Sequence, residues 1–188
     1  IRAIICPDKL GTEEWLEVMR TAHRVGLRST ATIMFGHVEG YTHWARHLLR
    51  VRDLQDETGG FTEFVPLPFV HMEAPIWRKG QARSGPSFRE ALLMHAVARL
   101  VLHPVIPNIQ ASWVKLGRDG VAAALRAGVN DLGGTLMDES ITRAAGGQNG
   151  QIFDPDQMVA LAERVGRHAV QRTTLYASVP QPQLQAAE

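Results

Sequence analysis

The fold class is decided by the stretch STATIMFGHVE, residues 29–39, and by the segments on either side of it. Its first seven residues are mostly β-branched or apolar, which is typical of a buried strand. Residues 12–25 before it and 42–58 after it carry apolar side chains at helical spacing. A buried strand between two amphipathic helices predicts a parallel sheet built from strand–helix units.

The same alternation continues along the chain. Ser87 and Glu90 form a capping box, and Asp154 followed by a proline is a typical helix start. Further helices are expected at residues 87–102, 118–127 and 154–165. Further strands are expected at residues 61–67, 108–112, 129–134 and 172–176, with a strand-like run at 1–6 and a long loop at 69–86.

About five strand–helix units are present, whereas a closed eightfold barrel takes roughly 250 residues. We therefore expect the carboxyl-terminal part of a partial, TIM-like (β/α) barrel over residues 1–178, followed by a disordered tail at 179–188. The chain does not begin with methionine, which favours a fragment without its upstream strands. The sheet edge that those strands would cover is then free, so we expect an edge-mediated homodimer.

The composition excludes several classes of protein. The 188 residues are 45% hydrophobic, and 20 basic residues against 19 acidic ones give a net charge of +1. This balance argues against a nucleic-acid partner. No apolar run approaches the roughly 18 residues of a membrane span, so no membrane partner and a cytoplasmic location are expected. The single cysteine, Cys6, excludes a multi-cysteine metal or iron–sulfur site within this chain.

Polar side chains gather where the predicted strands end, which is where parallel α/β folds bind ligands. His37 and Glu39 follow the strand at 29–35, and His71 and Glu73 repeat the same spacing in the next loop. Such pairs can transfer protons or ligate a metal, or they can simply hydrogen-bond their own turn. The residues alone leave these interpretations open.

Three other features have simpler interpretations. His43 and His47 are one helical turn apart but lack the glutamate of metalloprotease helices, so we interpret them as structural. The glycine-rich segment 146–150 lacks the ending of a phosphate loop and is expected to be a mobile flap. The basic segment 78–89 suits either a bound anion or a solvated loop.

Several runs carry a family resemblance. Three of them are TIMFGHVE at 32–39, LQDETGGF at 54–61 and FVPLPF at 64–69. These resemble the radical S-adenosylmethionine family that makes deazaflavins and menaquinone precursors. Five more are HMEAPIW at 71–77, QASWVKLG at 110–117, NDLGGTLM at 130–137, ESI at 139–141 and QRTTLY at 171–176. All eight together resemble the tyrosine-using half of the FO synthases, over residues 5–178.

The resemblance implies a radical S-adenosylmethionine barrel with a 4Fe-4S cluster. In such enzymes S-adenosylmethionine yields a 5′-deoxyadenosyl radical, which abstracts hydrogen from tyrosine. The 4-hydroxybenzyl unit is joined to 5-amino-6-ribitylaminouracil, and a ring-closing radical partner domain completes the deazaflavin. The family holds its cluster with C-x-x-x-C-x-x-C, which this sequence lacks. The cluster ligands are therefore not in this chain, which alone is expected to be inactive.

The resemblance also implies site residues, while no catalytic residue and no metal ligand is assigned. Cofactor binding is expected at Gly36, His37 and Glu39. Substrate binding is expected at six polar positions: His71, Glu73, Gln110, Asn130, Asp131 and Glu139.

Two alternatives come from other classes of protein. One is a metal-dependent hydrolase on a small α/β barrel, with the side chains of His37, Glu39, His71 and Glu73 as ligands. The other is a non-catalytic α/β binding domain that presents the same loops to a partner.

Overall fold

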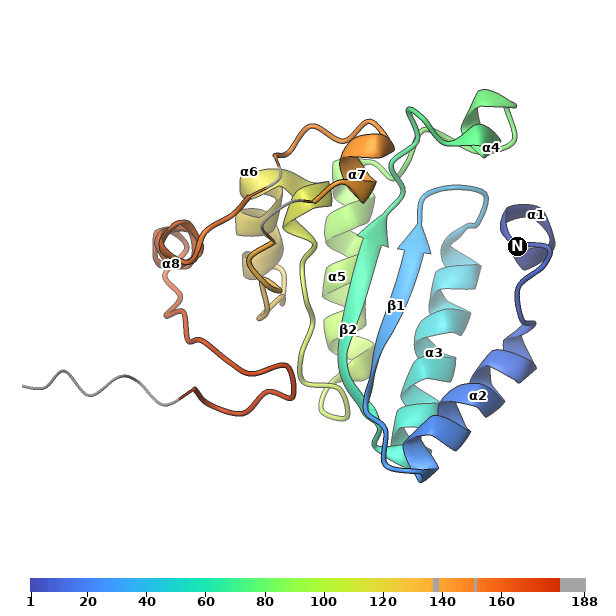
Figure 1. Cartoon of the computed structure of the whole chain (residues 1–188), viewed down its shortest axis with the longest axis horizontal. Coiled ribbons are helices and arrows are strands. Elements are labelled where there is room, and N and C mark those ends of the chain that lie inside the picture. Colours follow the sequence, from blue (N-terminus) through green and yellow to red (C-terminus); the bar gives the residue numbers. More distant parts are fainter. Residues whose placement is uncertain (137–138, 151, 180–188) are drawn as a thin grey trace, which may run out of the picture.

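The computed structural model describes residues 1–136, 139–150 and 152–179 (Figure 1). Its helices are α1 (Arg2–Ile5), α2 (Thr12–Arg24), α3 (Tyr41–Thr58), α4 (Pro75–Arg78), α5 (Phe88–Leu102), α6 (Trp113–Arg126), α7 (Ile141–Ala144) and α8 (Pro155–Arg164). Its strands are β1 (Ser29–Phe35) and β2 (Phe61–Pro68). Apart from residue 179, the tail predicted at 179–188 lies outside the described residues.

The two strands are parallel and lie side by side, with Thr30 opposite Glu63 and Met34 opposite Leu67. The sheet extends beyond β2 through single parallel bridges. Phe64 pairs with Ile109, and Gln110 pairs with Asp131. Two parallel strands with helices between them confirm the mixed α/β class.

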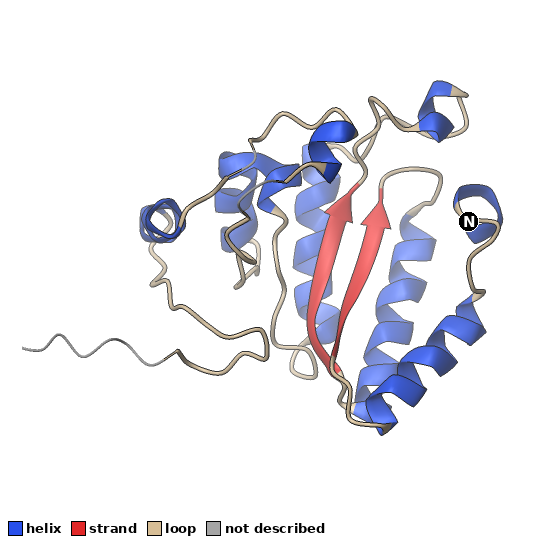
Figure 2. Cartoon of the chain, in the orientation of Figure 1, coloured by secondary structure: helices blue, strands red, loops and turns tan. Residues whose placement is uncertain are grey.

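Helices α3 and α5 cover one face of the sheet (Figure 2). Alternate residues of β1 point to opposite faces, as the pleat of a strand requires. Ala31, Ile33 and Phe35 are buried in the core, whereas Thr32 and Met34 are exposed on the other face. We call this second face the inner face, and Thr32 and Met34 on it line a cavity together with residues of α1.

Six predicted elements are confirmed to within a few residues. They are the helices at 12–25, 42–58, 87–102 and 154–165 and the strands at 29–35 and 61–67. Local signals explain this agreement. Gly59 ends α3 in a left-handed conformation (φ 62°), and the Ser87–Glu90 capping box and the Asp154 side chain begin α5 and α8.

Other predictions need correction. The run at 1–6 forms the single-turn helix α1 and pairs with neither of the described strands. The segments 108–112 and 129–134 make only the bridges at Ile109, Gln110 and Asp131, and 172–176 makes a turn closed by an antiparallel bridge between Arg172 and Ser178.

The loop predicted at 69–86 contains the short helix α4. The helix predicted at 118–127 is confirmed as the longer part of α6, and a single helical turn at 113–116 precedes it, separated by the non-helical Gly117. No helix in the described ranges is long and apolar enough to cross a membrane.

Gln55 joins α3 to the sheet, and its substitution gives a test of the fold. Its side chain is 8% exposed, accepts from the Phe61 amide at 2.8 Å and donates to the Phe61 and Val105 carbonyls at 3.1 and 3.0 Å. Gln55→Leu leaves these buried backbone groups unpaired, so we expect a loss of about 2 kcal/mol or more in the free energy of unfolding. Urea denaturation measures it.

The control is Asp56→Leu at the next, exposed position. It should change stability by no more than about 0.5 kcal/mol. Equal stabilities for the two variants would contradict the role given to Gln55.

Candidate functional site

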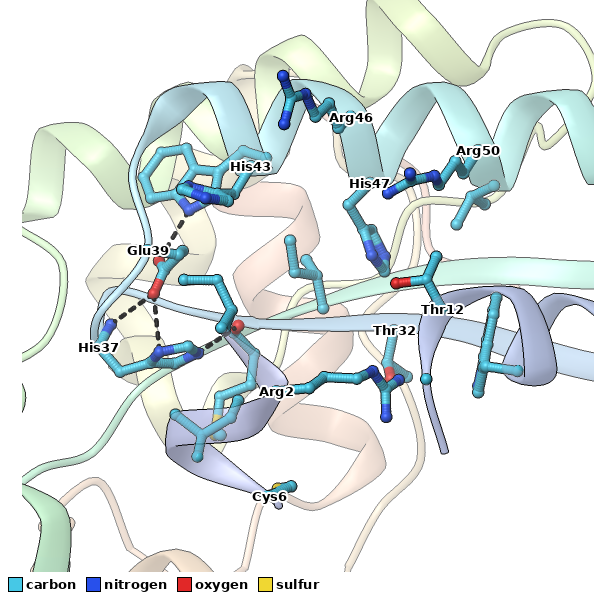
Figure 3. Close-up of a pocket in the computed structure, with 18 of the residues that line it drawn as sticks. Arg2, Cys6, Thr12, Thr32, His37, Glu39, His43, Arg46, His47 and Arg50 are labelled. Carbon is cyan, nitrogen blue, oxygen red and sulfur yellow. Dashed lines mark hydrogen bonds and ion pairs between the residues drawn. The ribbon is translucent and has the colours of Figure 1, made fainter. Parts of the chain in front are cut away.

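The turn after β1 is held together by one carboxylate. Glu39 accepts hydrogen bonds from the Gly36 amide, from the His37 amide at 2.9 Å and from Trp44 Nε1 at 2.8 Å (Figure 3). His37 Nδ1 lies 2.9 Å from the same carboxylate, and His37 Nε2 lies 3.1 Å from the Met34 carbonyl. The side chains of His37 and Glu39 are only 3% and 4% exposed. The structure thus brings this predicted pair together as a rigid turn.

The pKa of Glu39 reflects these contacts. Burial by itself would raise the pKa of this carboxyl, but hydrogen bonds from His37, Gly36 and Trp44 outweigh it and hold the pKa far below its usual value. Glu39 is therefore ionised at neutral pH, and the turn is preorganised around a fixed negative charge.

Gly36 is required by the same turn. Its φ of +93° favours glycine, and a Cβ atom there would lie 2.3 Å from Pro86 Cδ. The loop that follows β2 returns to this point, because the Arg83 amide donates to the His37 carbonyl at 3.0 Å. The His37 ring also meets the Phe69 ring edge-on, with centroids 5.8 Å apart. The loops after β1 and β2 therefore form one unit at the carboxyl end of the sheet.

His71 and Glu73 do not join the Glu39 turn in a metal site. Glu73 pairs with Arg78 on the surface, and both side chains are at least half exposed. His71 packs edge-on against Trp77, with ring centroids 4.7 Å apart. In the described part of the chain, no group of three or more His, Cys, Asp and Glu side chains is placed to hold a metal ion.

A second polar cluster lies on the inner face, and we call it the inner-face cluster. It is formed by Glu63, Gln110, Asp131, Arg172 and Tyr176. Tyr176 places its hydroxyl against the carboxylates of both Glu63 and Asp131. Arg172 lies 2.6 Å from Asp131 and 3.4 Å from Glu63, and its guanidinium stacks over the Tyr176 ring at 4.0 Å.

This cluster is buried and electrostatically coupled. Side-chain exposure is 13% for Glu63 and 5% for Asp131. Burial raises the pKa of the Tyr176 hydroxyl, and the hydrogen bonds to Asp131 and Glu63 raise it further. Tyr176 therefore stays protonated and donates its one hydrogen to either of the two carboxylates. Glu63 is the third residue of β2, so the cluster lies roughly 16 Å before the carboxyl end of that strand.

The remaining predicted residues lie apart from one another. Asn130 is exposed and accepts from the Ile109 amide at 2.9 Å and from Arg99 at 2.6 Å, on the side opposite its neighbour Asp131. Glu139 accepts from the Thr142 amide at 2.9 and 3.0 Å and caps α7.

A cavity of about 670 Å³ lies between β1, α3 and the α1–α2 segment (Figure 3). Arg2, Arg46 and Arg50 border it together with His43 and His47. Burial lowers the pKa of His47 to about 4, so this ring is neutral at pH 7. His43 Nδ1 accepts from the Gly40 amide at 3.2 Å and caps α3.

Sequence reasoning assigned no role to Glu63, Arg172 or Tyr176. The signals were present, because Glu63 is a charged residue inside a buried strand, and Arg172 and Tyr176 belong to the QRTTLY run. Only the fold shows that the two segments meet.

The depressed pKa of Glu39 gives a second prediction. Glu39→Gln removes the charge, so we expect a loss of about 1–3 kcal/mol in unfolding free energy at pH 7. Because the folded-state pKa is depressed, this contribution is present above the unfolded pKa of about 4.3 and is lost as the pH falls below it. The difference in unfolding free energy between wild type and Glu39→Gln, measured by urea denaturation at a series of pH values, should therefore shrink between pH 6 and pH 3.

The exposed Glu13→Gln variant is the control and should follow wild type at every pH. A constant gap between wild type and Glu39→Gln across the titration would contradict the assignment.

Comparison with known proteins agrees with the sequence resemblance. Residues 58–184 match the family model described as CofH/MqnC C-terminal region. The chain is 52% identical over 177 residues to the FO synthase of Mycobacterium leprae, covering 94% of this chain and 20% of that protein. It is 51% identical over 187 residues to the FO synthase of Streptomyces avermitilis, covering 100% of this chain and 22% of that protein.

A third relative is shorter. The 5-amino-6-(D-ribitylamino)uracil--L-tyrosine 4-hydroxyphenyl transferase of Methanopyrus kandleri is 51% identical over 179 residues, covering 95% of this chain and 48% of that protein. The chain thus spans between a fifth and about half of the length of these relatives. Its sequence matches them across nearly its whole length, and it belongs to the CofH/MqnC family, whose C-terminal region it carries.

Proposed function

We propose that this chain is the C-terminal part of a radical S-adenosylmethionine barrel that transfers the 4-hydroxybenzyl group of tyrosine to 5-amino-6-ribitylaminouracil in deazaflavin synthesis. The observation that carries the proposal is the 51% identity, over 95% of this chain, to a relative whose name states a tyrosine 4-hydroxyphenyl transferase. The position of His37 and Glu39 in the loop after β1 supports it, because barrel enzymes bind their ligands at the carboxyl ends of the strands.

The described residues do not fit a 4Fe-4S cluster. Cys6 is the one cysteine of the sequence, and such clusters are held by several thiolates. We propose that the cluster ligands lie in the remaining length of a protein like its relatives.

S-adenosylmethionine is proposed to bind near Gly36, His37 and Glu39. His37 and Glu39 line the larger cavity beside β1, and the hydrogen bonds within the turn keep them fixed. Because the turn is already fixed, little free energy is lost in ordering it when a ligand binds against it.

The substrates tyrosine and the ribitylaminouracil are proposed to contact the remaining predicted residues. These are His71, Glu73, Gln110, Asn130, Asp131 and Glu139. Gln110 and Asp131 are the pair best placed for this, because both face the inner side of the sheet beside Glu63. The segment with Arg172 and Tyr176 covers that end of the inner face and excludes water from it. Water exclusion protects a radical intermediate from side reactions.

The partners are part of the same proposal. A ring-closing radical domain completes the deazaflavin from the product of this region. β1 pairs only with β2 among the described strands, so its other edge supports the expected edge-mediated dimer of the isolated chain.

The proposal is tested by comparing a full-length protein that contains this region with residues 1–188 alone. Both are treated with iron and sulfide under anaerobic conditions, reduced, and given S-adenosylmethionine, tyrosine and the ribitylaminouracil. We expect the full-length protein to form 5′-deoxyadenosine and the aromatic adduct, and the isolated chain to form neither. Cleavage of S-adenosylmethionine by the isolated chain would contradict the proposal.

Asp131 gives a sharper prediction in the full-length protein. Asp131→Ala removes the acceptor shared by Arg172, Tyr176 and the Gly133 amide. We expect turnover to fall by at least about a hundredfold, because the inner-face groups are no longer positioned. Cluster absorbance should be unchanged.

Asp119→Ala is the matched control, since its side chain is 95% exposed on α6. It should keep wild-type turnover. Full activity of Asp131→Ala would remove Asp131 from the site.

A further inference from the structure

A smaller cavity lies at the carboxyl end of the sheet, between three loops. Its volume is about 270 Å³, and it is lined by residues 69–72 after β2, residues 114–115 in the first turn of α6 and residues 147–149 after α7. Lys115 is the only lysine or arginine in this lining. Phe69 connects the cavity to the preceding turn, because its ring meets His37 edge-on.

The walls of this cavity are fixed by direct contacts. Asn149 Nδ2 donates to the Val114 carbonyl at 3.1 Å, and the Glu73 amide donates to the Ala145 carbonyl at 3.2 Å. Gly117 turns with φ 67° against the Asn149 side chain, where a Cβ atom would lie 2.9 Å from Oδ1. Direct contacts between the three loops therefore fix the shape of the cavity.

Lys115 lies at the edge of this cavity. It is half-buried, and burial lowers the pKa of its amino group, an effect that nearby Glu139 partly opposes. It belongs to the single helical turn at 113–116, which ends at the non-helical Gly117. Its ammonium has one hydrogen-bond partner among the described residues, the Thr142 hydroxyl at 3.4 Å, and no carboxylate there lies within ion-pair distance.

A desolvated cation without an ion pair destabilises a protein unless an anion completes its surroundings. The cavity beside Lys115 provides room for such an anion. Glu139 is close enough to act on the pKa of Lys115 but forms no ion pair with it, and its carboxylate accepts from the Thr142 amide instead. With the described residues as its surroundings, Lys115 therefore has room beside it for a small anionic group at the carboxyl end of the sheet.

We propose that Lys115 binds the α-carboxylate of an amino-acid ligand in this cavity. The proposal depends on the proposed function, which supplies two ligands with that group, tyrosine and the methionine part of S-adenosylmethionine. Lys115 pairs with the carboxylate through a charge-assisted hydrogen bond, and the ligand's remaining atoms extend past Phe69 toward the inner face. Lys115 is a binding residue and takes no part in bond breaking.

The test uses the full-length, cluster-loaded protein and the variant Lys115→Met, which keeps the length of the side chain without its charge. If tyrosine supplies the carboxylate, its KM should rise about tenfold to a hundredfold while kcat and the KM for S-adenosylmethionine stay within about twofold. If S-adenosylmethionine supplies the carboxylate, its KM should rise about tenfold to a hundredfold, and the KM for tyrosine should stay within about twofold. Either result supports the proposal and identifies the source.

Tyrosine analogues separate loss of charge recognition from general damage. Tyramine lacks the carboxylate, and 3-(4-hydroxyphenyl)propanoate keeps it without the ammonium. Where tyrosine is the source, Lys115→Met should weaken inhibition by the propanoate and leave inhibition by tyramine unchanged. The control Lys9→Met alters an exposed lysine outside the cavity and should leave every constant unchanged.

Lys115→Gln is measured in parallel, so that a folding defect in one variant does not decide the outcome. Active variants with both KM values within about twofold of wild type would overturn the assignment of Lys115 and leave the proposed function intact. Failure of both variants to fold, judged by circular dichroism, would assign Lys115 to the fold and also overturn it. An inactive wild-type protein would instead contradict the proposed function.

Discussion

The pairing of β1 with β2, with α3 and α5 packed on one side, is the constraint on which the rest of the structure depends. It buries Ala31, Ile33 and Phe35 against these helices and places Thr30, Thr32 and Glu63 on the opposite face. Carboxylates on such a face need donors, because an unpaired buried charge is costly. The C-terminal segment supplies them through Arg172 and Tyr176. The end of the described chain is thereby tied to strands more than one hundred residues earlier.

The candidate site has two levels along the strands. Near the carboxyl ends lie the Glu39 turn and the cavity with Lys115, which carry a fixed negative and a fixed positive charge. Nearer the amino end of β2 lies the inner-face cluster, where Glu63, Asp131 and Arg172 leave one net negative charge. Ligands with an ammonium, a carboxylate and many hydrogen-bond donors match this distribution. The proposed substrates, tyrosine and a ribityl-bearing aminouracil, have these groups.

Local elements were largely predictable from the sequence, and long-range ones were not. The strand at 29–35 and the ends of α3 and α5 are set by residues within a few positions, such as Gly59 and Ser87. A strand needs neighbours, however, and the β-branched run at 1–6 forms a helical turn that pairs with neither described strand, while 108–112 makes only two bridges. The His37–Glu39 pair was visible as a motif. The inner-face cluster joins Glu63 to Tyr176 across 113 positions, and no local pattern encodes that contact.

The central claim is that this region helps to move the aromatic part of tyrosine onto a uracil. The most direct measurement gives the full-length, cluster-loaded protein tyrosine with a deuterated ring, S-adenosylmethionine and 5-amino-6-ribitylaminouracil, and analyses the products by mass spectrometry. The account predicts that the ring label appears in an adduct of the uracil, together with 5′-deoxyadenosine. Formation of 5′-deoxyadenosine with all of the label retained in unreacted tyrosine would contradict it.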